Sequence, residues 1–190
     1  MGTQLPEPSS SLADPAQLLV TYLDFYRSEA VRKLAHLSDD EGRRSRLPSG
    51  WSPLELLSHL VHMERRWLVW GFAGEEVADP WGDKGPDGRW RVPAGASVGT
   101  LTAELLTGGA RTGTIVASAR LSDFAATGGR FSAVPTPTLG WILFHVLQEY
   151  ARHLGHLDVA RELADGVVGE DPAATRRLPG TSSGVAPGSG

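Results

Sequence analysis

The sequence predicts an all-α fold, a four-helix bundle with a long connection between the second and third helices. Three observations support this prediction. Four segments carry apolar residues at helical spacing, helix-starting residues precede them, and no stretch of the 190 residues alternates as a strand does. We expect one bundle domain at residues 14–169, preceded by a flexible N-terminus at 1–13. A disordered tail rich in Gly, Ser and Pro is expected at 170–190.

The first two helices are expected at residues 14–36 and 52–70, and they begin in the same way. Their opening residues, "DPAQ" and "SPLE", each place a capping side chain before a proline in the first turn. Each also has a residue three positions after the cap that can reach back to it. The shared signature predicts that both segments start at the capping residue.

The third and fourth helices are expected at residues 97–121 and 138–164. Gly108 and Gly109 weaken the third helix by about 1 kcal/mol each relative to alanine, so both a continuous and a kinked helix fit the sequence. Gly166 is suited to end the fourth helix because glycine readily adopts the left-handed conformation of a helix C-terminus.

The connection at residues 71–96 is too long for a simple bundle turn. Long segments of this kind are usually functional or disordered. This one contains Trp81, Trp90, Arg89 and Arg91. Two tryptophans argue against disorder, so we expect the segment to contribute to function.

Composition narrows the class of protein further. Apolar residues make up 41% and charged residues 21% of the chain, as in ordinary globular proteins. The net charge of -4 argues against a nucleic-acid partner, and the lack of cysteine excludes disulfides and a cysteine nucleophile. No window approaches the roughly 18 apolar residues of a membrane span, and the first residues lack a secretory signal pattern. We expect a cytoplasmic protein without a membrane partner.

Two polar residues of the fourth helix fall on its apolar face. On a helical wheel, Glu149 and His153 point toward the core, and their spacing of four residues makes their tips neighbours. A buried carboxylate costs several kcal/mol unless something compensates it. Three compensations are open: a plain ion pair, hydrogen bonds to other helices, or a shared metal ion.

The second helix offers a third ligand for such a metal. His59 lies at the edge of its buried face, whereas His62 falls on the polar face beside Ser58 and Arg65. We therefore expect His59 at the site and His62 in solvent. Two imidazoles and one carboxylate suit Zn²⁺, with Ni²⁺ and Fe²⁺ as alternatives, and leave a position open for water or substrate.

Two segments carry a resemblance to a known family. "GWSPLELLSHLVHMERRW" and "TLGWILFHVLQEYARHLGHLDVARELADG" resemble the second and fourth helices of DinB-like metal-binding bundles. The second segment is similar to the branch that contains mycothiol-dependent maleylpyruvate isomerases and mycothiol transferases. The resemblance implies one divalent metal held by His59, Glu149 and His153, and mycothiol as a thiol co-substrate.

Two departures from that family bear on the activity. The isomerases carry an additional C-terminal domain that contributes to their active site, whereas this chain has a Gly-rich tail. Relatives often have arginine before Trp141, where this chain has Gly140. The first difference argues against isomerisation, and the second removes any anion contact from that position.

The implied mechanism is attack of a metal-activated thiol on a small electrophile. Aromatic and cationic residues would form the pocket and contact the substrate or the thiol: Trp67, Trp70, Trp81, Arg89 and Arg91. His156 and Asp158 match the family motif and are candidates for support of the ligands or for surface pairs. Tyr150 is expected in the core.

Two other functions remain as alternatives. One is a metal-binding stress or interaction protein without turnover, dimeric through exposed helix faces. The other is a metal-dependent hydrolase, although the fourth helix has E-x-x-x-H and the chain lacks the H-E-x-x-H motif of metalloproteases. A cavity beside the open metal position would favour the transferase.

Overall fold

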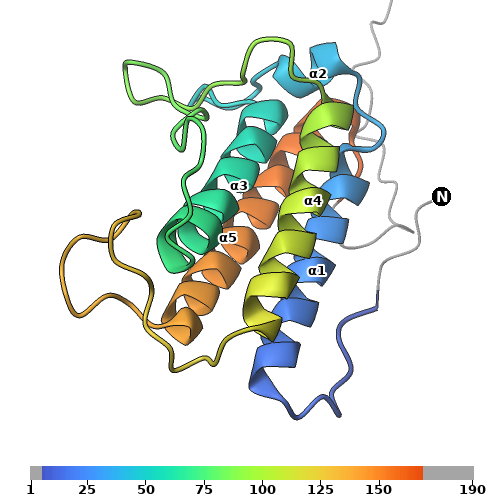
Figure 1. Ribbon diagram of the computed structural model, residues 1–190. Coiled ribbons are helices and arrows are strands. Elements are labelled where there is room, and N and C mark those ends of the chain that lie inside the picture. The colour runs from blue at the N-terminus through green and yellow to red at the C-terminus, as the bar shows by residue number, and fades with distance from the viewer. Residues whose placement is uncertain (1–5, 169–190) are drawn as a thin grey trace, which may run out of the picture.

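The structure, a computed structural model, describes residues 6–168 and contains four long helices packed side by side (Figure 1). A short helix precedes the second long helix, and a π-helical turn follows it. In chain order the elements are α1 (Pro15–Leu34), α2 (Asp39–Arg43), α3 (Pro53–Trp67), η1 (Leu68–Phe72), α4 (Val98–Ala117) and α5 (Leu139–Asp165). The described residues contain no β-strand, only two isolated bridges. The predicted all-α four-helix bundle is confirmed, while the expected tail at 170–190 lies outside the described residues.

The helix termini follow the signatures in the sequence. The Asp14 carboxylate accepts hydrogen bonds from the backbone amides of Ala16 and Gln17. Ser52 and Glu55 form a reciprocal capping box at the start of α3. α5 ends at Gly166, whose φ of 76° lies in the left-handed region. These caps explain why the long helices start and stop within a few residues of the expected positions.

α4 is continuous through its two adjacent glycines. Gly109 faces α1, where a Cβ atom would lie only 2.8 Å from Cδ of Arg27, whereas a Cβ at Gly108 would meet nothing within 4 Å. Gly109 therefore allows the Arg27 side chain to cross α4, and Gly108 has no such packing role.

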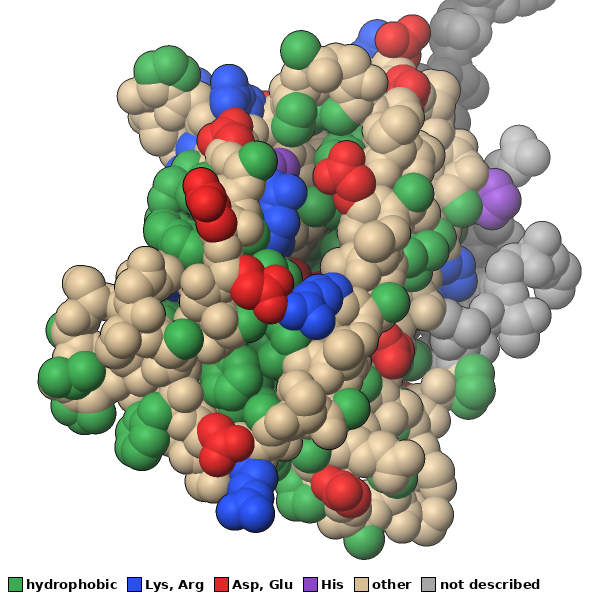
Figure 2. Space-filling view, viewed as in Figure 1, with side chains coloured by type: hydrophobic (Ala, Val, Ile, Leu, Met, Phe, Trp, Pro, Cys, Tyr) green, Lys and Arg blue, Asp and Glu red, His purple; other side chains and the backbone are tan. Residues whose placement is uncertain are grey.

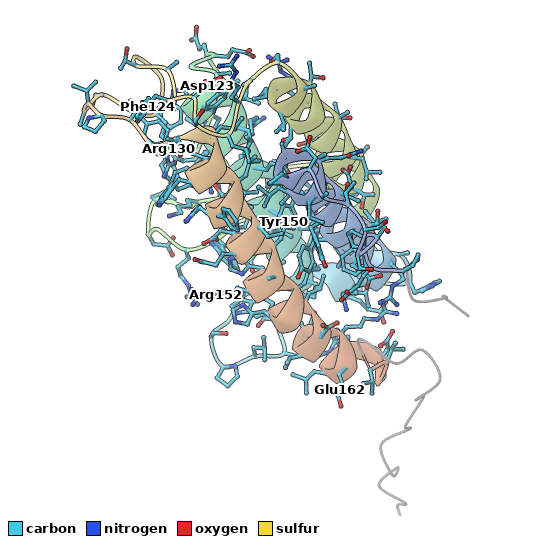
Figure 3. All side chains as sticks on the ribbon, turned by 90° about the horizontal axis from the view of Figure 1, so that it is seen from below. Asp123, Phe124, Arg130, Tyr150, Arg152 and Glu162 are labelled. Carbon is cyan, nitrogen blue, oxygen red and sulfur yellow. The ribbon has the colours of Figure 1, made fainter. Side chains whose placement is uncertain are left out.

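A buried polar network joins the four long helices at the centre of the bundle. Glu64 of α3 accepts hydrogen bonds from Arg27 of α1, Thr112 of α4 and Tyr150 of α5. The Tyr150 hydroxyl lies 2.5 Å from Oε2 of Glu64, and its ring is fully buried on the inner side of α5 (Figure 3). Buried charges are tolerated only when they are paired and hydrogen-bonded. The network meets that condition and fixes the mutual register of the helices.

The π-helical turn η1 extends α3 beyond Trp67 and anchors the segment between α4 and α5. The carbonyl of Trp70 accepts a hydrogen bond from the backbone amide of Arg130, and that of Phe72 accepts one from Ala126. π-helical turns often occur at functional sites. Here the turn binds the 118–138 segment to the end of α3.

The face formed by α3 and α4 is hollowed (Figure 2). A cavity of about 510 Å³ lies there, with Val61, Val69 and Ala103 among its apolar walls. None of the candidate metal ligands lines it. No helix in the described part of the chain is both long enough and apolar enough to span a bilayer.

Candidate metal site

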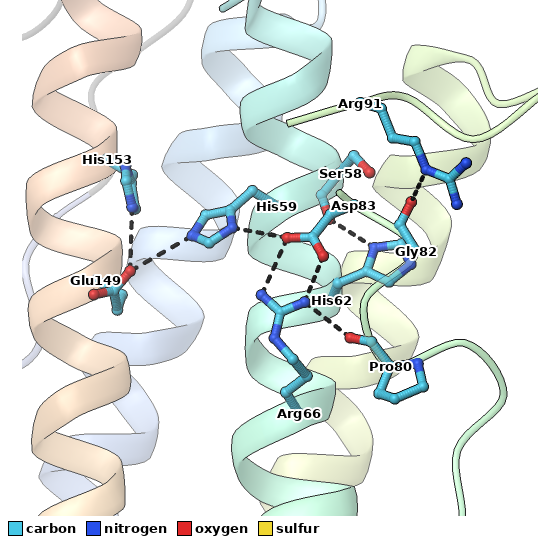
Figure 4. A network of polar contacts seen from close by, with 10 residues as sticks. All are labelled: Ser58, His59, His62, Arg66, Pro80, Gly82, Asp83, Arg91, Glu149 and His153. Atoms are coloured by element: carbon cyan, nitrogen blue, oxygen red, sulfur yellow. Dashed lines mark hydrogen bonds and ion pairs between the residues drawn. The ribbon is translucent and has the colours of Figure 1, made fainter. Parts of the chain in front are cut away.

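The three candidate ligands converge between α3 and α5. His59 comes from α3, and Glu149 and His153 come from successive turns of α5 (Figure 4). Oε2 of Glu149 lies 3.5 Å from Nε2 of His59 and 3.2 Å from Nε2 of His153. Each residue offers one ligand atom, and the three atoms all lie within 4.8 Å of one another. This spacing is compatible with a single ion between them.

His59 supplies the clearest sign that a ligand is needed. Its Nε2 atom is buried and has no hydrogen-bond partner, and Oε2 of Glu149, at 3.5 Å, is too distant for a good hydrogen bond. A buried polar atom without a partner costs about 1–3 kcal/mol. Two imidazole nitrogens and a carboxylate oxygen are donors that divalent transition metals accept, so the residues present fit a metal ion.

The protonation states suit the same ligand set. Burial, followed by the neighbouring His59, lowers the pKa of His153 to about 4, although Glu149 opposes the shift. Burial alone would raise the pKa of Glu149, but His153 and His59 bring it below its usual range. At neutral pH the pair is therefore a neutral imidazole beside a carboxylate, which is the form that binds metal. A plain ion pair would need a protonated His153.

Asp83, in the 71–96 connection, orients His59. Nδ1 of His59 donates to Oδ2 of Asp83 across 2.9 Å, and Arg66 pairs with both oxygens of the same carboxylate (Figure 4). Burial would raise the pKa of Asp83, but its hydrogen bonds from His59 and Arg66 lower it to about 2. Because the ionised carboxylate can only accept, the proton of His59 stays on Nδ1 and the lone pair on Nε2 faces the cluster.

Sequence reasoning missed Asp83 because no periodicity marks a residue in an irregular segment. Its only signal is the stretch "PWGDKG", in which the aspartate follows Trp81 and a glycine. The structure places Trp81 against Arg66. The guanidinium carbon of Arg66 lies 4.4 Å from the centre of the Trp81 ring. Trp81 thus contacts the residue that holds Asp83.

The expectation that His62 lies in solvent is wrong. Its side chain is buried, with 5% of its surface exposed, and its Nδ1 donates to the carbonyl of Ser58 across 2.9 Å. Gly82 packs so closely that a Cβ atom there would lie 2.6 Å from Nε2 of His62. The 71–96 connection therefore covers the face of α3 that the helical wheel assigned to water. His62 remains outside the three-residue cluster.

Trp90 and Trp51 flank the histidines of the cluster. The Trp90 ring stacks on His59, with centroids 4.4 Å apart and planes 18° apart, and meets His153 edge-on at 5.2 Å. Trp51 contacts both Trp90 and His156. These two tryptophans also line a cavity of about 760 Å³. The cluster therefore borders a cavity through its aromatic neighbours.

The candidate arginines lie around the same cavity. Arg89 and Arg91 both line it and are exposed. Arg89 donates to the carbonyl of Ser49, and Arg91 donates to that of Gly82. Both guanidinium groups hold loop segments together and keep further donors for a ligand.

A second set of rings extends from Glu149 in the other direction. Nε2 of His145 lies 3.9 Å from Oε1 of Glu149. The His145 ring lies 4.2 Å from Trp67 and stacks on Trp141 at 5.5 Å. Trp67 therefore reaches the cluster through His145.

The two motif residues near the end of α5 differ in their surroundings. Nδ1 of His156 lies 3.4 Å from Nδ1 of His153. Asp158 instead forms an ion pair with Lys33 of α1. His156 is thus placed beside a candidate ligand, whereas Asp158 ties α5 to α1.

Four long helices with a His–Glu–His cluster between α3 and α5 define a DinB-like four-helix bundle with a candidate metal site. A family model described as Mycothiol-S-transferase matches residues 18–166. The chain belongs to the mycothiol S-transferase family.

No curated protein matches it in sequence. Among solved structures it is similar to a conserved protein from Enterococcus faecalis, with 17% identity, a TM-score of 0.61, and coverage of 82% of this chain and 99% of that one. At that identity the likeness concerns the fold alone.

Proposed function

We propose that this chain is a metal-dependent thiol S-transferase that joins mycothiol to a small electrophile. The metal ligands in this proposal are His59, Glu149 and His153. The observation that carries it is the buried, unpartnered Nε2 of His59, which faces a carboxylate oxygen and a neutral imidazole. Zn²⁺ fits this donor set best, and Ni²⁺ and Fe²⁺ are the alternatives. Family membership supports mycothiol as the thiol.

The chemistry requires a thiolate at neutral pH. A divalent ion bound at the cluster supplies positive charge that favours the thiolate form of a coordinated thiol. In the reaction, the thiol proton passes to solvent and the sulfur forms a bond to the electrophilic carbon. The leaving group departs with the electron pair of its bond to that carbon, so that the products are a thioether and the displaced anion.

The residues around the cluster would position the reactants. Asp83 and Arg66 hold His59 in one orientation, and Trp90 shields one side of the histidines from water. The cavity beside Trp51 and Trp90 is large enough for a small thiol, at about 760 Å³. This cavity favours a transferase over the alternative of a metal-binding protein without turnover.

Cobalt substitution tests the proposal. Thiolate coordination to Co²⁺ gives a sulfur-to-metal charge-transfer band, so mycothiol added to the cobalt-loaded protein should produce that band. Glu149→Ala should abolish it by losing the ion, while His36→Ala, which removes an exposed histidine at the end of α1, should leave it unchanged. If mycothiol leaves the cobalt spectrum unchanged and is not consumed with any of a panel of electrophiles, the transferase function is excluded.

A further inference from the structure

Within residues 6–168, Arg130 is a cation without a counter-ion, and it lies near the candidate site. It lies in the 118–138 segment, near the N-terminal end of α5 (Figure 3). Its guanidinium carbon is 4.0 Å from the Trp67 ring centre and 5.5 Å from that of Trp81. Its Nη1 atom is buried and has no hydrogen-bond partner. In the described part of the chain, no carboxylate forms an ion pair with this side chain.

The backbone around Arg130 is built to hold it in place. Its amide donates to the carbonyl of Trp70 in the π-helical turn across 3.2 Å. Gly129 passes so close to the same turn that a Cβ atom there would lie 2.1 Å from the Trp70 carbonyl oxygen. Only glycine permits this approach. The position of Arg130 is therefore fixed by packing against η1 and does not depend on an ion pair of its own.

The electrostatic environment leaves the charge of Arg130 uncompensated. Burial, followed by the neighbouring Arg66, lowers the pKa of Arg130 from its ordinary value. Arg66 already pairs with Asp83, so that carboxylate is engaged by another guanidinium and by His59. The rings of Trp67 and Trp81 stabilise a cation through their faces but cannot neutralise it. An anion that reaches the half-buried guanidinium group of Arg130 would supply the missing negative charge.

A continuous series of contacts leads from Arg130 to the metal ligands. Trp67 touches both Arg130 and His145, and His145 lies 3.9 Å from Glu149. A cavity of about 520 Å³ borders Trp67 and Trp141 and is lined otherwise by Phe124, Phe131 and residues 135–138. This side of the cluster combines an apolar cavity with a nearby cation. The cavity at Trp51 and Trp90 lies on the side of the histidines and remains for the thiol.

We propose that Arg130 binds the anionic group of the electrophilic acceptor, so that the acceptor is an apolar carboxylic acid. The apolar body would lie against Trp67 and Trp141, and the carboxylate would pair with the guanidinium. This inference rests on the proposed function for the identity of the site, but it concerns which acceptor is chosen. Arg130 is a specificity-determining residue in this view and takes no part in holding the metal.

Calorimetry with two matched probes tests the proposal. 3-Phenylpropionate and its uncharged amide, 3-phenylpropanamide, have the same apolar body, and each is titrated into the zinc-loaded and the metal-free protein. The parent should prefer the acid in both forms, because Arg130 is present in both. Arg130→Ala should weaken binding of the acid by about tenfold to a hundredfold, the loss of a charge-assisted hydrogen bond. Binding of the amide should not change.

Two further variants complete the experiment. Arg130→Lys should retain part of the preference because it keeps the charge but loses the planar fork. Arg120→Ala removes an exposed arginine from the same segment and should bind the acid like the parent. Equal binding of acid and amide, no measurable binding of the acid, or a preference that survives in Arg130→Ala would each overturn the proposal. The cobalt spectrum with mycothiol is independent of these titrations, so failure of the proposed function is recognised separately.

Discussion

At the scale of single residues, the candidate site depends on a histidine whose two nitrogens have different tasks. Nδ1 of His59 is hydrogen-bonded to Asp83, whereas Nε2 faces Glu149 and has no hydrogen-bond partner. A carboxylate behind a metal-binding imidazole fixes both the tautomer and the orientation of the ring. The residue that matters most for His59 therefore lies in an irregular connection 24 positions further along the chain.

Asp83→Asn should weaken zinc binding by about tenfold to a hundredfold, since such supporting carboxylates commonly contribute that much to affinity. The amide can donate as well as accept, so it no longer fixes the tautomer of His59 and no longer balances Arg66. Competition with a chelating dye measures the change. Glu76→Gln, which removes an exposed charge from the same connection, is the control. Unchanged zinc affinity in Asp83→Asn would contradict the positioning role.

The variant His62→Ala tests whether His62 is a buried structural residue or a metal ligand. Because His62 is buried and bonded to the Ser58 carbonyl but lies outside the cluster, the variant should lose about 1–3 kcal/mol of unfolding free energy. Its zinc stoichiometry should equal that of the parent. Urea denaturation and elemental analysis give the two quantities. Loss of the metal at full stability would show that His62 is a ligand.

At the scale of elements, α4 shows how one helix can contain two glycines with opposite roles. Gly109 gives room to Arg27, which is pinned in the buried network around Glu64, whereas nothing lies near a Cβ at Gly108. At both positions the intrinsic helix propensity favours alanine over glycine by the same amount, about 1 kcal/mol. Packing alone distinguishes them.

Gly108→Ala should therefore raise the unfolding free energy by up to about 1 kcal/mol, while Gly109→Ala should lower it. In Gly109→Ala the new methyl group would meet Cδ and Nε of Arg27 at 2.8 Å and disturb its pairing with Glu64. Thermal and urea unfolding of the two variants form a matched pair. Stabilisation by both substitutions would mean that Arg27 does not pass over Gly109.

At the scale of the whole molecule, the sequence predicted the features that depend on the regular spacing of residues along helices. The four long helices, their caps and the convergence of His59 with Glu149 and His153 follow from spacing on helical faces. The assignment of these three residues as ligands stays a prediction. The same holds for the substrate contacts Trp67, Trp81, Arg89 and Arg91. A homodimer also stays a prediction.

The remaining features depend on the two long connections, which have no period. Burial of His62, the bond from His59 to Asp83 and the anchoring of Arg130 on η1 all arise where an irregular segment packs against α3 or its extension. A helical wheel shows only the polarity of the residues on α3, so it assigns to solvent the face that these segments cover. It therefore misplaces His62 and cannot find Asp83 or Arg130.

The most direct test of the central claim is the metal content of the protein purified without an affinity tag. We expect the parent and His36→Ala to hold about one divalent ion per chain, as measured by elemental analysis, because the exposed His36 lies outside the cluster. His59→Ala, Glu149→Ala and His153→Ala should each lose most of it. Full stoichiometry in any one of these three variants would contradict its assignment as a ligand, and full stoichiometry in all three would contradict the metal site itself.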